Sequence, residues 1–191
     1  MFETNIRERV NVDETDSHDD DEKLVLSAKK NLSDFKKIYE KWLDRVYRYC
    51  YFRVGSKKDA EDLTSQVFLK AYEGLPSYRH RGYFAAWLFS IARARVTDFY
   101  RKKKNELPIV EAHEISDESN LSFQIAENEI LDEVLDLINC LSEKDQELLR
   151  LRFVAELTYR EIGVIFHRRE DAVRKAIWRV LARIRNEVNH E

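Results

Sequence analysis

The stretch TYREIGVIFHRREDAVRKAIWRVLARIR, residues 158–185, decides the fold expected for this chain. Apolar side chains recur at helical spacing on both sides of His167–Arg169, which predicts two helices joined by a short turn. The first helix opens with a full capping-box pattern from Thr158 to Glu161, and Leu157 is placed as its hydrophobic staple. These features predict a helix-turn-helix, a unit whose second helix lies in the major groove of DNA.

The second helix of this unit, expected from about Glu170 to Val188, carries basic side chains opposite its apolar stripe. At about 100° per residue, Lys175 and Arg179 point almost directly away from that stripe, with Trp178 beside them. Arginine and lysine can reach guanine edges or phosphates, and tryptophan can pack on a sugar or a base methyl group. A solvated basic helix with Trp178 buried by a neighbouring helix is the alternative. The predicted DNA contacts are Arg168, Arg174, Lys175, Trp178 and Arg179.

Net charge varies strongly along the sequence, although the 191 residues together carry only −3 at pH 7. Residues 32–104 hold 17 basic and 8 acidic side chains, and residues 150–185 hold 10 and 4. Residues 105–131, between them, hold 7 acidic side chains and no basic one. Two basic modules joined by an acidic segment favour nucleic-acid binding over charge runs that are merely solvated.

The chain has four Gly and two Pro, and this scarcity of turn residues predicts an all-α fold of long helices. No apolar run is long enough to span a bilayer and no secretory signal is evident, so a cytoplasmic protein with two free cysteines, Cys50 and Cys140, is expected. The predicted organisation is an acidic disordered extension over 1–31, a helical domain over 32–104, an irregular acidic linker over 105–128, and the helix-turn-helix domain over 129–191.

A second constellation lies in the loop Leu75–Gly82 and the helix expected after it. Aromatic and basic side chains alternate there, which suits stacking on unpaired bases while the backbone is gripped. A pocket of this kind can offset the cost of flipping a base out of a duplex. Trp87 is expected in the core, whereas Tyr78 and His80 are expected to be exposed.

Catalytic chemistry is not indicated anywhere in the sequence. It contains no Gly-rich phosphate loop, no cluster of metal ligands and no nucleophile with an evident base. We therefore expect neither an enzyme nor a metal or cofactor site.

Three segments resemble the extracytoplasmic-function (ECF) sigma factors, the short class of sigma-70 proteins with only regions two and four. Residues 59–69, DAEDLTSQVFL, resemble the DAEDL-x-x-x-VFL signature of region two. Residues 84–101 resemble its F-x-x-WL-x-x-IA-R…D-x-x-R helix, and residues 141–185 resemble region four. The turn at His167–Asp171 departs from the family's glycine-containing pattern, so promoter sequence is not carried over.

The resemblance implies a promoter-specificity subunit that binds core RNA polymerase and promoter DNA, with an anti-sigma factor as a frequent partner. The free chain is expected to be a monomer that does not insert into membranes. The implied polymerase contacts are Asp59, Glu61, Asp62, Gln66 and Phe68. The residues implied in reading and melting the minus-ten element are Tyr78, Arg79, His80, Arg81, Phe84, Trp87, Arg93 and Arg95. The helix-turn-helix would bind the minus-thirty-five element.

Two other functions remain open on the sequence alone. One is a stand-alone helix-turn-helix regulator with a helical sensor or dimerisation domain. The other is a helical adaptor whose basic faces meet acidic proteins.

Overall fold

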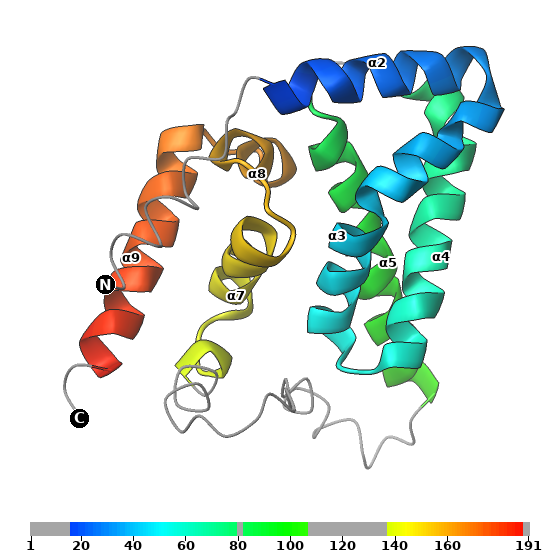
Figure 1. Ribbon diagram of the computed structural model, residues 1–191. Helices are drawn as coiled ribbons and strands as arrows, with labels where there is room; N and C mark the ends of the chain where they lie inside the picture. Colours follow the sequence, from blue (N-terminus) through cyan, green and yellow to red (C-terminus); the bar gives the residue numbers. More distant parts are fainter. Residues whose placement is uncertain (1–15, 80–81, 107–136, 189–191) are drawn as a thin grey trace.

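The computed structural model describes residues 16–79, 82–106 and 137–188, and these residues form helices and no strand (Figure 1). They make up an N-terminal module, residues 16–106, and a C-terminal module, residues 137–188. The N-terminal module contains α2 (Asp16–Lys30), the 3₁₀ turn η1 (Leu32–Asp34), α3 (Phe35–Val54), α4 (Lys57–Gly74), the 3₁₀ turn η2 (Leu75–Ser77) and α5 (Phe84–Glu106). The C-terminal module contains α7 (Glu143–Leu149), the π-helical η3 (Arg150–Val154), α8 (Tyr159–Phe166) and α9 (Glu170–Val188).

Helix α2 corrects the prediction that residues 1–31 are disordered, because residues 16–30 are helical. Figure 1 shows α2 crossing one end of the bundle made by α3, α4 and α5. Its Val25 and Ala28 are fully buried, and its Asp21 pairs with Lys41 of α3 at 2.8 Å. The second half of α2 thus carries a short apolar stripe, which packs on the bundle although the segment begins with acidic residues. Residues 1–15 lie outside the described part of the chain.

The three long helices of the N-terminal module lie close to where the apolar periodicity predicts them. Helix α4 ends at Gly74 as expected. The φ of Gly74 is −82°, however, and not the left-handed value of a glycine C-cap. The space beside Gly74 is narrow, since a Cβ there would lie 3.2 Å from the indole ring of Trp87. The linker predicted at 105–128 lies outside the described residues, except for 105–106, which end α5.

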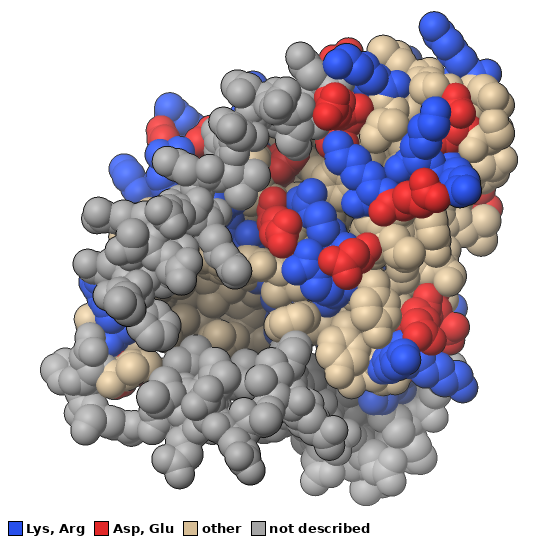
Figure 2. Space-filling view, in the orientation of Figure 1, with Lys and Arg blue, Asp and Glu red and all other residues tan. Residues whose placement is uncertain are grey.

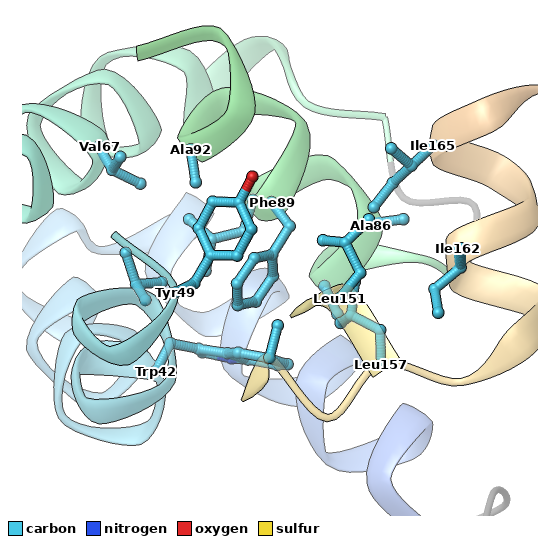
Figure 3. Close-up of a cluster of buried hydrophobic side chains, with 14 of the residues drawn as sticks. Trp42, Tyr49, Val67, Ala86, Phe89, Ala92, Leu151, Leu157, Ile162 and Ile165 are labelled. Atoms are coloured by element: carbon cyan, nitrogen blue, oxygen red, sulfur yellow. The ribbon is translucent and has the colours of Figure 1, made fainter. Parts of the chain in front are cut away.

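The core is continuous between the two modules (Figure 3). Tyr49 of α3 packs edge-on against Phe89 of α5, with ring centroids 5.5 Å apart. Leu151 of η3 and Ile162 of α8 are fully buried beside them. The C-terminal module therefore packs on α3 and α5 of the N-terminal module, an arrangement that no periodicity in the sequence predicts.

Candidate nucleic-acid interface

The helix-turn-helix begins with the capping box that the sequence predicts. The Thr158 hydroxyl accepts a hydrogen bond from the Glu161 amide at 3.2 Å, and the Glu161 carboxylate accepts one from the Thr158 amide at 2.8 Å. Leu157 and Ile162 are both fully buried, as a hydrophobic staple requires. These contacts fix where α8 starts and how the chain enters it.

A close backbone approach forms the turn between α8 and α9. The Arg168 amide donates to the Gly163 carbonyl at 2.8 Å, and His167 adopts a left-handed φ of +53°. A Cβ on Gly163 would lie only 2.6 Å from the Arg168 carbonyl oxygen. The turn therefore depends on a glycine inside α8, a role that sequence analysis missed because Gly163 reads there as an ordinary helix residue.

Helix α9 presents the basic face expected of a DNA-reading helix. Its apolar side is buried through Val173 and Ile177, while Lys175 and Arg179 are exposed. The Trp178 side chain is 55% exposed, which excludes the alternative in which a neighbouring helix buries it. Two further predicted contacts are also exposed: Arg168 in the turn, and Arg174, which pairs with Glu170 at 2.7 Å and lies over the Tyr159 ring at 5.2 Å.

Of the aromatic residues predicted at the minus-ten site, Tyr78 is more buried than predicted, whereas Trp87, expected in the core, is only partly buried. Tyr78 is 8% exposed, so the prediction that its loop position exposes it is wrong. Its ring lies 4.7 Å from the Trp87 ring and 5.7 Å from the ring of Phe84, which is itself 2% exposed. Tyr78 and Phe84 therefore support the loop from inside, and Trp87 is half-buried. Arg79 is exposed, and His80 and Arg81 lie outside the described residues.

An open cleft lies where the two modules meet, with a volume of about 460 Å³. Tyr78, Tyr83 and Trp87 line it from the N-terminal module, and Val164 and His167 line it from the C-terminal module. The guanidinium of Arg160 lies 5.1 Å above the Tyr83 ring. The helix-turn-helix therefore touches the segment that carries the minus-ten constellation.

A second contact between the two modules is made by Glu147, a buried carboxylate on α7. Glu147 is 5% exposed, and it accepts hydrogen bonds from the Tyr49 hydroxyl at 2.6 Å and the Arg93 Nε at 2.9 Å. Arg53 adds a third contact at 3.2 Å. Burial raises the pKa of the Tyr49 phenol well above its ordinary value, and the charge of Glu147 raises that pKa further. We call Glu147, Tyr49, Arg53 and Arg93 the Glu147 cluster.

The two predicted minus-ten arginines on α5 are both engaged within the protein. Arg93 belongs to the Glu147 cluster, and its guanidinium also lies 4.6 Å from the Phe166 ring of α8. Arg95 pairs with Asp98 one turn later on α5, at 3.0 Å. Arg93 thus contacts the C-terminal module while 34% of its side chain stays exposed, whereas Arg95 is held within its own helix.

The predicted polymerase contacts lie on α4. Glu61, Asp62 and Gln66 are exposed, and Asp59 is partly so. Phe68 is 4% exposed and packs edge-on against Tyr39 and Phe35, so it supports α4 from the core and offers no surface to a partner. Its neighbour Leu69 is 56% exposed. The sequence prediction overlooked Leu69, although it shares a helix face with Asp62 and Gln66.

Charge on the visible surface is mixed. On the part of the face that Figure 2 colours, lysine and arginine side chains are interspersed with aspartate and glutamate side chains. Within the described residues, no group of His, Cys, Asp and Glu has the arrangement of a metal site. No helix in the same part of the chain is long and apolar enough to cross a membrane.

Two family models match the modules in order. Sigma-70 region 2 matches residues 38–106, and Sigma-70 region 4 matches residues 131–184. Solved structures with similar folds include CnrH in complex with the cytosolic domain of CnrY, with a TM-score of 0.62 at 17% identity, covering 88% of this chain and 96% of that one. The sigma factor RpoE of Bartonella quintana, in complex with the anti-sigma factor NepR, has a TM-score of 0.59 at 20% identity, covering 82% and 97%.

Characterised proteins similar to this chain include three ECF RNA polymerase sigma factors. It is 32% identical to BldN of Streptomyces coelicolor over 165 residues, which cover 83% of this chain and only 62% of BldN. It is 28% identical to SigW of Bacillus subtilis over 178 residues, covering 81% and 95%. It is 30% identical to SigM of the same species over 149 residues, covering 78% and 91%. The chain therefore belongs to the ECF RNA polymerase sigma factors.

Proposed function

We propose that this chain is a promoter-specificity subunit that binds core RNA polymerase and directs it to its start sites. The N-terminal module reads and melts the minus-ten element, and α9 binds the minus-thirty-five element. The polymerase supplies the chemistry, so the chain itself is not an enzyme and acts where polymerase acts, in the cytoplasm. One observation carries the proposal: α9 exposes Lys175, Trp178 and Arg179 together, on a helix-turn-helix with intact capping.

The exposed face of α4 supports the polymerase part of the proposal. Asp62, Gln66 and Leu69 are exposed and stand at spacings of four and three, so they lie along one side of the helix. We propose that this side docks on the clamp helices of polymerase, with the carboxylate and amide as polar contacts and Leu69 as the apolar centre. Removal of Leu69 should therefore weaken core binding more than removal of Glu61, which lies toward the edge of the face.

The minus-ten part of the proposal is more indirect. Arg79 of the loop Leu75–Gly82 is exposed, while Tyr78, Phe84 and Trp87 pack against one another beside it. We propose that this support holds the loop open for a flipped base and that Arg93 becomes available to the strand once the modules separate. The comparisons favour this function over the stand-alone helix-turn-helix regulator, since both sigma regions match in one chain.

Reconstitution with core polymerase tests the proposal. The purified chain is added to core enzyme with genomic DNA of its source organism, and the transcript 5′ ends are mapped. New start sites are expected only when the chain is present. A chain that neither binds core nor creates start sites would refute the proposal.

Two double variants, Lys175→Ala/Arg179→Ala and Lys36→Ala/Lys37→Ala, separate promoter recognition from core binding. Each double variant removes two exposed positive charges. The α9 variant should lose start-site selection while keeping core binding, because a lost base contact costs about 1–3 kcal/mol and each lost phosphate contact lowers the salt slope by about 1. The α3 variant should behave as the parent protein. Equal losses in both would mean that general charge, and not recognition, explains the effect.

An anti-sigma partner is a further part of the proposal. The solved structures of CnrH and RpoE hold those sigma factors with CnrY and NepR, respectively. We extend this mode of control to the present chain, and transcription from its mapped start sites should fall when the partner is added.

A further inference from the structure

We propose that Lys29 of α2 is a positioning residue for the minus-ten segment, and that it acts by holding the backbone carbonyl of Tyr78. This inference rests on the proposed function, because it supposes that Arg79, the next residue, contacts minus-ten DNA. It goes beyond that function by giving a role to a helix that precedes residues 38–106, the part of the chain that Sigma-70 region 2 matches.

One side of α2 aims Lys29 at the rest of the N-terminal module. Asp21, Val25 and Lys29 follow one another at a spacing of four, so they lie along the same side of the helix. Asp21 pairs with Lys41 of α3 at 2.8 Å, and Val25 is fully buried. One turn further on, the Lys29 ammonium donates a hydrogen bond to the carbonyl oxygen of Tyr78. The contacts that seat α2 therefore also place this lysine.

The last turns of α2 are fixed by further contacts. The Ser27 hydroxyl donates to the Asp34 carboxylate at 2.6 Å, which ties α2 to η1, and Ala28 is fully buried. Helix α2 also packs against η2 and α5, which lie on either side of Tyr78 in the chain. The Lys29 side chain therefore extends toward Tyr78 from a fixed base.

The Tyr78 carbonyl sets the direction in which the backbone continues to Arg79. The Tyr78 amide already donates to the carbonyl oxygens of Gly74 and Leu75, at 3.0 and 3.1 Å. Because a peptide group is planar, a bond that fixes the Tyr78 carbonyl also fixes the Arg79 amide. Lys29 supplies that bond, and its charge strengthens it. The exposed Arg79 is thus oriented by a helix whose lysine lies 49 positions before Tyr78.

Two other roles are open to a lysine at this place. A lysine in the last turn of a helix complements the helix dipole, and an exposed lysine can contact a DNA phosphate. Lys30 has the same two properties, because it is exposed and lies in the same turn. Lys30→Met is therefore the matched control for Lys29→Met, and salt dependence separates positioning from a phosphate contact.

The test uses the full chain bound to core polymerase. The probe is a labelled single-stranded oligonucleotide with the non-template minus-ten sequence of a start site mapped with the parent protein. Fluorescence anisotropy measures its affinity over a series of salt concentrations, while core binding and helical circular dichroism are followed in parallel. Lys29→Met removes the ammonium and keeps an unbranched stem, and Lys29→Arg keeps the charge and the N–H donors. Lys29→Met is also combined with Arg79→Ala.

Lys29→Met should weaken oligonucleotide binding about tenfold, the effect of losing a hydrogen bond to a charged group, and leave the salt slope unchanged. Lys30→Met and Lys29→Arg should stay within about twofold of the parent protein, because both keep a cation that can donate to Tyr78. With Arg79 already replaced by alanine, Lys29→Met should add little further loss, because residues that act through one another are not additive.

A salt slope lowered by about 0.7 in Lys29→Met would mean a direct phosphate contact and would overturn the positioning role. Equal losses in Lys29→Met and Lys30→Met, additive losses with Arg79→Ala, or a loss of core binding or helix content would overturn it as well. A parent complex that does not bind the oligonucleotide would refute the minus-ten function itself. Full binding by Lys29→Met would refute only the role of Lys29.

Discussion

Replacement of Gly163 by alanine tests the geometry of the helix-turn-helix, because two physical effects predict opposite signs. In an ordinary helix interior, alanine is more favourable than glycine by about 1 kcal/mol. Here the added Cβ would lie 2.6 Å from the Arg168 carbonyl oxygen, against an ordinary contact of about 3.4 Å or more. That oxygen belongs to the backbone, so it cannot move away as a flexible side chain would.

The crowding should outweigh the helix propensity. Overpacking costs typically about 1–3 kcal/mol, and moving the turn weakens the hydrogen bond from the Arg168 amide to the Gly163 carbonyl, which contributes about 1 kcal/mol. After the gain in propensity is subtracted, Gly163→Ala should lower the free energy of unfolding by roughly 1–3 kcal/mol. At the size of this chain, each kcal/mol corresponds to a Tm decrease of about 2–4 °C.

Urea unfolding followed by circular dichroism measures the change, and binding of minus-thirty-five DNA reports whether α9 keeps its orientation. Gly55→Ala is a useful comparison, because Gly55 has a left-handed φ of +69° but nothing within 4 Å of its missing Cβ. It should lose stability through backbone strain alone and leave DNA binding unchanged. If Gly163→Ala is instead more stable than the parent by about 1 kcal/mol, the close approach is wrong.

Three further predictions concern single side chains. His167→Gly should raise the free energy of unfolding by about 1 kcal/mol in urea denaturation, because His167 holds a left-handed φ of +53° that glycine adopts without penalty. Burial raises the pKa of the Cys50 thiol to about 12, so iodoacetamide at pH 8 should alkylate the exposed Cys140 alone until the protein is denatured, as mass spectrometry can show. The raised pKa of Tyr49 means that its contribution to stability is full below its ordinary pKa of 10.0 and is lost as the pH rises above it. Tyr49→Phe should therefore flatten the alkaline end of the stability profile; an unchanged profile would contradict the assignment.

Local patterns in the sequence predict the elements of this fold well, because each depends on neighbours in the chain. The capping box at Thr158 follows from the residue types at its two ends, and helical spacing places Trp178 off the apolar stripe; only the structure excludes its burial by a neighbouring helix. The burial of Tyr78 could not be predicted in this way, since it depends on packing against Phe84 and Trp87 of α5 from a loop whose composition suggests exposure.

Contacts between distant residues are the part that local patterns cannot predict. Tyr49 and Glu147 are separated by 98 positions, and no pattern in the sequence predicts the 2.6 Å hydrogen bond between them. The role of Gly163 is equally hard to predict from sequence, although its contact with Arg168 is local, because that role depends on having no side chain. The missing Cβ becomes informative only when the turn after α8 is placed against it.

The excess of basic residues in the N-terminal module is used in part for contacts within the protein. In the sequence, 17 basic side chains against 8 acidic ones over residues 32–104 indicate a surface for phosphate. In the structure, Arg45, Arg53 and Arg93 donate hydrogen bonds to oxygen acceptors of the C-terminal module. A positive charge count therefore records how many anionic partners a face can bind, and it does not say which of them is bound.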